Sequence, residues 1–387
     1  MTRWIRLFTA LALGTASALA LAQDVVKIGL ILPMTGPFAS TGRQIEGAVK
    51  LYMQVHGTTV AGKKVEVILR DDAGVADTTR RHAQELVVND KVQVLAGFGL
   101  TPLALATVPV ATQAKIPQLV MAAATASITE QSPYVVRTGF TLPQVTVPIA
   151  EWATKNGIRK AVTLVSDYGP GIDAETAFKK AFTAGGGTVA SELRVPLRNP
   201  DFAPFLQRVK DATPDAVFVF VPSGVGAPFM KQFIERGLDK SGIRLIGTGD
   251  VTDDDILNDM GDVALGVITS FHYSAAHDSP ANRQYVEGFR KLNGMRPNFH
   301  SVGGYDGMHA IYKALEATKG NAAGDALLNA MKGLSFESPR GPVSIYPATR
   351  DPIQNVYLRK VERRGGELWN VEFATMTAVK DPTHGAK

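Results

Sequence analysis

The sequence predicts an α/β protein made of two doubly wound, Rossmann-like lobes. Short runs of β-branched and aliphatic residues alternate with longer segments of helical period, and Gly, Pro, Asn or Asp separates them. Some short runs, such as Ala216–Val221, are apolar on both faces, as in a parallel sheet that helices cover on both sides. The length of 387 residues fits two domains of roughly 100 to 200 residues each.

The first lobe begins with the compact apolar run Val25–Leu32, which predicts a strand. The segment 42–56 follows and places Ile45, Val49 and Tyr52 on one stripe of helical spacing, which predicts a helix. The same alternation predicts strands at 65–69, 93–96 and 119–121 and helices at 78–88 and 103–114.

A second set of elements begins after residue 140 and predicts the second lobe. We expect helices at 146–155, 174–184, 203–212 and 227–236 and strands at 161–165, 188–195 and 216–221. Three later helices, expected to complete the first lobe, carry apolar faces but bring few new strands: 282–292, 304–318 and 323–331. The runs 355–361 and 368–373 flank Gly365-Gly366 and predict an antiparallel hairpin that completes the second lobe.

The first 22 residues predict a secretory signal peptide. Arg3 and Arg6 precede the apolar stretch 7–19, and Ala20-Leu21-Ala22 offers small residues where a signal peptidase cuts. A membrane anchor is the alternative, but the stretch is shorter than the roughly 20 residues that span a bilayer. We therefore expect an exported protein. At the other end of the chain, the last residues, 381–387, are expected to form a flexible tail.

Composition excludes several classes of function. The chain has no Cys, which rules out disulfides, thiolate metal sites, iron-sulfur clusters and a Cys nucleophile. Its net charge of +5 comes without clustered Lys or Arg, so neither a nucleic acid nor a membrane surface is expected as a partner.

No catalytic, cofactor or metal motif is recognisable. The sequence lacks a G-x-S-x-G elbow, a P-loop and an H-E-x-x-H pair, and its seven His lack ligand spacing. The acidic runs Asp71-Asp72 and 253–255 are read as residues that end a strand or favour a helix N-terminus. We expect no catalytic residues, no cofactor and no metal.

Loops of small residues follow the predicted strands of the first lobe and are the candidate binding elements. They span 33–42, 97–102 and 122–127. In an open α/β sheet, ligands bind beyond the carboxyl ends of the strands, where free amide groups favour an anion. Thr101 and Thr125 can add hydroxyl donors. The alternative is that these residues only form tight turns.

In the second lobe, three strand ends offer side chains to the same crevice. The turn 166–171 presents Tyr168, and the next strand ends beside Ser223. Asp250 lies at a third strand end, where it can face the crevice and pair with a cationic group. Its alternative role is to cap a helix that starts near Thr252.

At these loops the chain resembles the periplasmic solute-binding proteins of the branched-chain amino acid transport type, the leucine/isoleucine/valine-binding family. The likeness rests on the segments 27–42, 122–125 and 167–171 and covers the whole mature chain. It implies the type I periplasmic binding fold, with three hinge crossovers near 138–141, 270–273 and 346–350. The chain would then divide into a signal at 1–22, lobe 1 at 23–139 plus 273–347, and lobe 2 at 140–272 plus 348–380.

The resemblance also implies roles for single residues. The family's grip on a carboxylate falls on Thr101 or Pro102, on Ala123 and on Thr125, and its amine-pairing acid falls on Asp250. The full set of expected ligand-binding residues is Ser40, Thr41, Thr101, Pro102, Ala123, Ala124, Thr125, Tyr168, Ser223, Asp250 and His300. The chain lacks the disulfide frequent in lobe 1 of this family, and small residues around Ser40-Thr41 replace a common aromatic. This extra room makes an aromatic carboxylate as acceptable as leucine.

The expected function is that of a monomeric solute-binding component of an ABC importer. It would close its lobes around a small carboxylate-bearing ligand, an amino acid or an aromatic acid, and deliver it to an ABC permease. A ligand sensor of the same fold, feeding a receptor or regulator, is an alternative. A secreted α/β hydrolase is another, although it needs a nucleophile-base pair or a metal.

Overall fold

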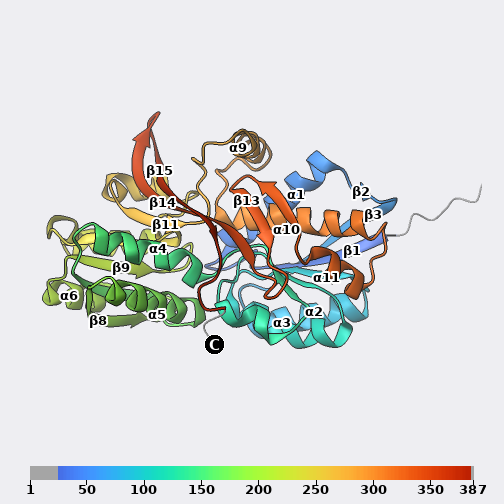
Figure 1. Cartoon of the computed structure of the whole chain (residues 1–387), viewed down its shortest axis with the longest axis horizontal. Helices are drawn as coiled ribbons and strands as arrows, with labels where there is room; N and C mark the ends of the chain where they lie inside the picture. Colours follow the sequence, from blue (N-terminus) through green and yellow to red (C-terminus); the bar gives the residue numbers. More distant parts are fainter. Residues whose placement is uncertain (1–24, 385–387) are drawn as a thin grey trace, which may run out of the picture.

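The computed structural model describes residues 25–384, so the predicted signal peptide lies outside the described residues. Two α/β lobes lie side by side along the long axis of the molecule, and the chain passes between them three times (Figure 1). Within residues 25–384, no helix combines the length and the apolarity needed to cross a membrane.

Lobe 1 is built on a six-stranded sheet in the order β2-β3-β1-β4-β5-β6, parallel except for the short edge strand β2. Its strands are β1 (Val25–Leu32), β2 (Thr59–Val60), β3 (Lys63–Asp71), β4 (Val94–Gly97), β5 (Gln118–Val120) and β6 (Val135–Arg137). Its helices are α1 (Ala39–His56), α2 (Ala76–Val88), α3 (Thr101–Ala114), η1 (Ala126–Gln131), α9 (Pro280–Asn293), α10 (Phe299–Ala317) and α11 (Gly324–Met331). Helices α1, α10 and α11 share one apolar cluster with the sheet, and α2 and α3 share another.

Lobe 2 is built on a nine-stranded sheet in the order β12-β13-β14-β11-β10-β9-β7-β8, with β15 paired to β14. Its strands are β7 (Lys160–Ser166), β8 (Thr188–Val195), β9 (Ala216–Phe220), β10 (Arg244–Thr248), β11 (Ile268–Phe271), β12 (Ser335–Ser338), β13 (Gly341–Ile345), β14 (Pro352–Arg364) and β15 (Glu367–Val379). Its helices are α4 (Leu142–Lys155), α5 (Gly169–Ala184), α6 (Ala203–Ala212), α7 (Gly226–Glu235), η2 (Leu238–Lys240), η3 (Gly249–Thr252), α8 (Leu257–Met260) and η4 (Gly261–Ala264).

Strand β9 confirms that an apolar run marks a strand buried on both faces. Phe218 and Phe220 enter the cluster formed with α4 and α5, whereas Val217 and Val219 enter the cluster formed with α6 and α7. Consecutive side chains of a strand point to opposite faces of the sheet, and helices cover both faces here, so all four side chains are buried. The predicted fold of two doubly wound lobes is therefore confirmed.

Several helices begin earlier than the sequence predicts. Helix α1 begins at Ala39 rather than residue 42, and α5 begins at Gly169 rather than residue 174. Pro170 occupies the first turn of α5, where its missing N–H group costs nothing and its fixed φ suits the helix. The Gly- and Pro-rich segments therefore supply helix starts at the cleft rather than only loops.

Strands β12 and β13 were not expected, because they are short and contain Pro342 and Gly341. They extend the sheet of lobe 2 toward lobe 1, and Ile345 of β13 packs in the apolar cluster of lobe 1. The long strand β14 pairs with β13 at its start and with β11 and β15 further along. It thus forms one of the connections between the lobes (Figure 1).

His384, in the tail segment that follows Asp381, has two carboxylate partners in lobe 1 and at the third crossover. The His384 imidazole lies 3.0 Å from a carboxylate oxygen of Asp351 and 3.1 Å from one of Glu130. Asp351 in turn pairs with the buried Arg137 at 3.1 Å.

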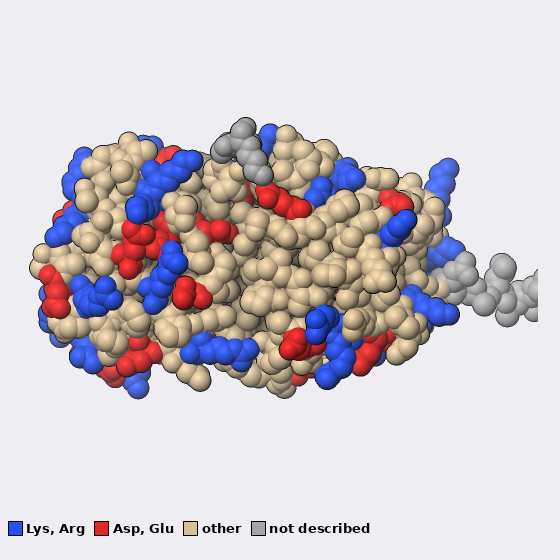
Figure 2. All heavy atoms as spheres, turned by 90° about the horizontal axis from the view of Figure 1, so that it is seen from below, with Lys and Arg blue, Asp and Glu red and all other residues tan. Residues whose placement is uncertain are grey.

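Charged side chains of both signs are interspersed on the face shown in Figure 2, with a broad uncharged area toward its middle. This face carries no continuous basic stripe of the kind that tracks a nucleic acid backbone.

Candidate functional site

The loops that follow strands of the two sheets enclose a cavity between the lobes. About 370 Å³ of space lies between its lining atoms, part of it open to solvent. Lobe 1 lines it with the segments after β1, β4 and β5, and lobe 2 lines it with the segments after β7, β9 and β10. The lining residues are Phe38, Thr41, Gly99, Leu100, Thr101, Ala122, Ala123, Ala124, Phe140, Leu142, Tyr168, Pro170, Phe220, Pro222, Ser223, Asp250 and His300.

Most of the residues that line the cavity are apolar. Four residues besides His300 have aromatic side chains. Phe38 and Phe140 come from lobe 1 and the first crossover, and Tyr168 and Phe220 come from lobe 2. The rings of Tyr168 and Phe220 stack at 6.1 Å between centroids with a 23° angle between their planes. Flat walls of this kind suit a flat ligand.

At the lobe 1 end of the cavity, hydroxyl and amide groups converge. Thr101 begins α3, and its Oγ1 lies 2.8 Å from Oγ1 of Thr125. The Ala124 amide has no acceptor among the described residues, whereas the Ala123 amide donates to the carbonyl of Phe98 at 3.0 Å. The hydroxyls and the Ala124 amide can therefore bind an anion here.

At the lobe 2 end, Asp250 presents a buried carboxyl group. It lies in η3, directly after β10, and accepts a hydrogen bond of 2.8 Å from the Thr248 hydroxyl. Burial raises the pKa of Asp250 to about 7, although the Thr248 hydroxyl and the charge of Arg359 act in the opposite direction. The carboxyl group therefore changes its charge near neutral pH.

His300 and Ser223 add two buried polar atoms without a partner. His300 is the second residue of α10, and its Nδ1 has no hydrogen-bond partner among the described residues. Burial lowers the pKa of His300 to about 3, so its imidazole is neutral. The Ser223 hydroxyl is likewise buried and unpartnered within the described chain. Such atoms are costly unless a ligand or water satisfies them.

Eight of the eleven residues that the sequence analysis expects in the site line the cavity. Thr125 lies behind the lining, where it contacts Thr101. Ser40 instead donates to Asp255 across the cleft, and Pro102 is exposed on the first turn of α3. Neither Ser40 nor Pro102 is brought to the cavity wall.

Sequence reasoning missed the phenylalanines at 38, 140 and 220. Phe38 and Phe220 lie in or beside segments already considered, one in the loop after β1 and the other at the end of β9. Both therefore lie where ligands bind in an open α/β sheet, and this position could have identified them. Phe140 lies in a crossover between lobes, and no local pattern points to it.

The lobes contact each other around the cavity. The Ala126 amide donates to Asp173 at 2.8 Å, and the Arg198 guanidinium donates to the Gly74 carbonyl at 2.6 Å. A Cβ atom added at Gly169 of lobe 2 would lie 2.4 Å from Oγ1 of Thr125 of lobe 1. The structure thus shows the lobes closed on each other.

Residues 25–367 match the periplasmic binding protein family. The chain belongs to this family, in its branched-chain amino acid transport type. A periplasmic binding protein has two lobes that enclose a solute, which accords with the cavity described above. The members similar to this chain are solute-binding proteins of ABC transporters, and the family is periplasmic.

Relatives of this periplasmic binding protein match over nearly its whole length. Leu/Ile/Val-binding protein homolog 6 of Brucella melitensis biotype 1 is 48% identical, with 97% of each chain covered. An ABC transporter solute-binding protein from Rhodopseudomonas palustris BisB5, solved in complex with 3,4-dihydroxybenzoic acid, is 64% identical with a TM-score of 0.92, covering 93% of this chain and 99% of that one. Another, from Rhodopseudomonas palustris HaA2 in complex with p-hydroxybenzoic acid, is 44% identical with a TM-score of 0.91, covering 94% and 100%.

Among residues 25–384 of this binding protein, no group of three or more His, Asp or Glu is placed to hold a metal ion.

Proposed function

We propose that this protein is the solute-binding component of an ABC importer and that its ligand is a hydroxylated aromatic carboxylate. The cavity itself is the observation that carries the proposal. It combines four aromatic walls with hydroxyl and amide donors at one end and a carboxyl group at the other. A ligand of matching polarity has a carboxylate at one end of a flat ring and a hydroxyl at the other.

The two ends of the cavity differ in what they accept. A ligand carboxylate avoids Asp250, because like charges repel strongly in a buried site, and therefore lies near Thr101 and Ala124. A ring hydroxyl then faces Asp250, to which it can donate a hydrogen bond. The solved relatives that hold 3,4-dihydroxybenzoic acid and p-hydroxybenzoic acid support this ligand class.

A branched-chain amino acid is the second candidate. Asp250 can pair with an α-ammonium group, and several relatives carry Leu/Ile/Val-binding names. Against it, the walls are flat and aromatic rather than shaped for a branched aliphatic side chain.

The proposal includes export and delivery. We infer that residues 1–22 are removed on passage to the periplasm, that the protein acts as a monomer, and that the closed form docks on an ABC permease. Closure can respond to a ligand only through contacts that favour the closed state, and Tyr168 and Asp250 of lobe 2 supply such contacts.

Calorimetric titration of the protein purified from the periplasm tests the ligand class. We expect the order 3,4-dihydroxybenzoate or 4-hydroxybenzoate, then benzoate, then leucine. Tight leucine binding with no response to any benzoate would refute the proposal. Determination of the N-terminal residue of the same material tests the cleavage after Ala22.

A further inference from the structure

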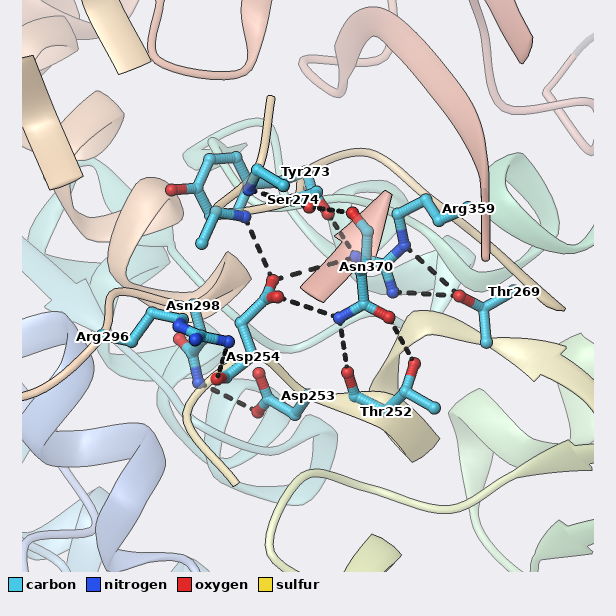
Figure 3. Close-up of polar contacts among 12 residues, drawn as sticks. Thr252, Asp253, Asp254, Thr269, Tyr273, Ser274, Arg296, Asn298, Arg359 and Asn370 are labelled. Carbon is cyan, nitrogen blue, oxygen red and sulfur yellow. Dashed lines mark hydrogen bonds and ion pairs between the residues drawn. The ribbon is translucent and has the colours of Figure 1, made fainter. Parts of the chain in front are cut away.

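A buried network of polar side chains joins the two lobes beside the cavity (Figure 3). It connects the loop after η3 in lobe 2 to the start of α10 in lobe 1. The two residues that join the lobes in this network are Asp253 and Asn298, which are 1% and 0% exposed. Nδ2 of Asn298 donates to Oδ2 of Asp253 at 2.9 Å, a contact that we call the Asp253–Asn298 bridge.

Asn298 is fixed on the lobe 1 side by further hydrogen bonds, three of which involve its side chain or its amide. Its Oδ1 accepts from the amides of His300 at 2.9 Å and Ser301 at 3.2 Å, so it is the N-cap of α10. Its own amide donates to Oε1 of Gln44 at 3.0 Å. Gln44 lies one helical turn after Thr41 on α1, so Asn298 contacts the backbone of one pocket residue and the helix of another.

Asp253 is fixed on the lobe 2 side through its neighbours in the chain. Asp254 accepts from Nδ2 of Asn370 at 2.9 Å and from the amide of Ala275 at 3.2 Å. Asn370 also donates to the carbonyl of Thr252 at 2.7 Å. These contacts hold the loop that follows Asp250 against strand β15 and the second crossover.

The remaining oxygen of Asp253 meets no donor N–H group within residues 25–384 and lies beside the carboxyl group of Asp255. Burial and three neighbouring aspartates raise the pKa of Asp253 well above its ordinary value. Burying a carboxyl group costs free energy unless hydrogen bonds compensate for its lost hydration. Loss of the hydrogen bond to Asn298 should therefore destabilise the closed arrangement.

We propose that Asn298 is a positioning residue for ligand capture, because its side chain ties the Asp250 loop of lobe 2 to the helix of lobe 1 that carries His300. When the lobes close, the Asp250 loop and the start of α10 then take one fixed position relative to each other. This inference rests on the proposed solute-binding function and adds a residue that does not itself line the cavity.

Four variants test the bridge by titration with 4-hydroxybenzoate. Asn298→Ser keeps an N-cap oxygen for α10 but cannot reach Asp253. Asp253→Ala removes the acceptor, and Asp253→Asn keeps an acceptor oxygen. Asn321→Ser is the matched control, because Oδ1 of Asn321 also accepts from an amide, that of Ala323 at 3.0 Å, on an exposed turn of lobe 1.

We expect Asn298→Ser and Asp253→Ala each to weaken binding about 5- to 150-fold, the range for leaving a buried partner unsatisfied. Asp253→Asn should stay within about threefold of the wild type, because its hydrogen bond to Asn298 remains. The double variant Asn298→Ser/Asp253→Ala should lose no more affinity than the single variant with the larger loss, because the two residues act through one contact. Additive losses, or an Asn298→Ser protein that binds like Asn321→Ser, would overturn the proposal.

A second measurement does not depend on the ligand. Because the chain has no Cys, the substitutions Asp77→Cys in lobe 1 and Arg208→Cys in lobe 2 place two unique labels at exposed positions. We expect longer distances between the labels in Asn298→Ser than in the wild type or Asn321→Ser, and a return in Asp253→Asn. If the wild type binds no aromatic acid, the proposed ligand class is wrong, but the label distances still test the Asp253–Asn298 bridge. Identical distance distributions in all the proteins would refute the proposed role of the bridge.

Discussion

Replacing Asp250 with alanine should separate hydroxylated from unsubstituted benzoates. In the proposed binding mode, a ring hydroxyl donates to the Asp250 carboxylate, which is 4% exposed and already accepts from Thr248 at 2.8 Å. A buried hydrogen bond to a charged group contributes about 1.5 to 3 kcal/mol. Its loss should weaken 4-hydroxybenzoate about 10- to 150-fold.

Benzoate provides the internal control for this substitution. It has no hydroxyl to lose, and its carboxylate no longer shares the cavity with a second carboxyl group, so its affinity should stay the same or rise. Calorimetric titration of both ligands against wild type and Asp250→Ala gives the comparison. Equal losses for the two ligands would refute the assigned orientation, and no loss for either would remove Asp250 from the site.

The pH dependence of the same pair of ligands tests the charge of Asp250. A donated hydrogen bond stabilises the ionised carboxylate, so the ligand hydroxyl lowers the pKa of Asp250 from its value of about 7 in the closed cavity without ligand. The preference for 4-hydroxybenzoate over benzoate should therefore be full above about pH 7 and decline as the pH falls through it. In Asp250→Asn the ratio of the two affinities should not change between pH 6 and 8.

Three further substitutions follow from the geometry. Thr101→Val should weaken benzoate and 4-hydroxybenzoate alike, by about tenfold or more, because it removes a hydroxyl from the carboxylate end; a loss confined to one ligand in the same titration would contradict this. Gly169→Ala should weaken all ligands while leaving the melting temperature of the ligand-free protein unchanged, because its Cβ would meet Thr125 of the other lobe at 2.4 Å; unchanged affinity would show that closure tolerates it. Asp306→Ala should lower the free energy of unfolding by about 3 to 5 kcal/mol in denaturant titration, because it leaves the fully buried Arg340, now 2.7 Å away, without its partner; a loss under 1 kcal/mol would contradict this.

The sequence predicts the fold well because its signals are local. The apolar run of β9 and the helical stripe of α1 depend only on residues near one another in the chain. The site is predicted in part for the same reason, since carboxyl ends of parallel strands meet at one edge of a sheet. Thr101, Tyr168 and Asp250, which are expected on this ground, line the cavity.

The remainder of the site depends on contacts between distant segments. Phe140 belongs to a crossover, and Asn298 to the connection between α9 and α10, so neither carries a strand-end signal. The acidic run 253–255 was interpreted as favouring a helix N-terminus, yet Asp253 and Asp254 are buried against Asn298 and Asn370. The Asp253–Asn298 contact joins the two lobes, and the Asp254–Asn370 contact joins segments of lobe 2 that are far apart in the chain.

The described cavity lining contains no lysine or arginine. An anionic ligand would therefore need another source of positive potential. Helices α1, α3, α5 and α10 all begin at the cavity, where Thr41, Thr101, Pro170 and His300 lie in their first turns. Each helix start carries a partial positive charge of roughly half a unit, from amides that are fixed by the fold. Helices α1, α3 and α10 belong to lobe 1, so the amides at their starts keep their orientation when the lobes close, and they favour a carboxylate at the lobe 1 end of the cavity. The aromatic side chains then limit the shape of the ring that fits beside this carboxylate.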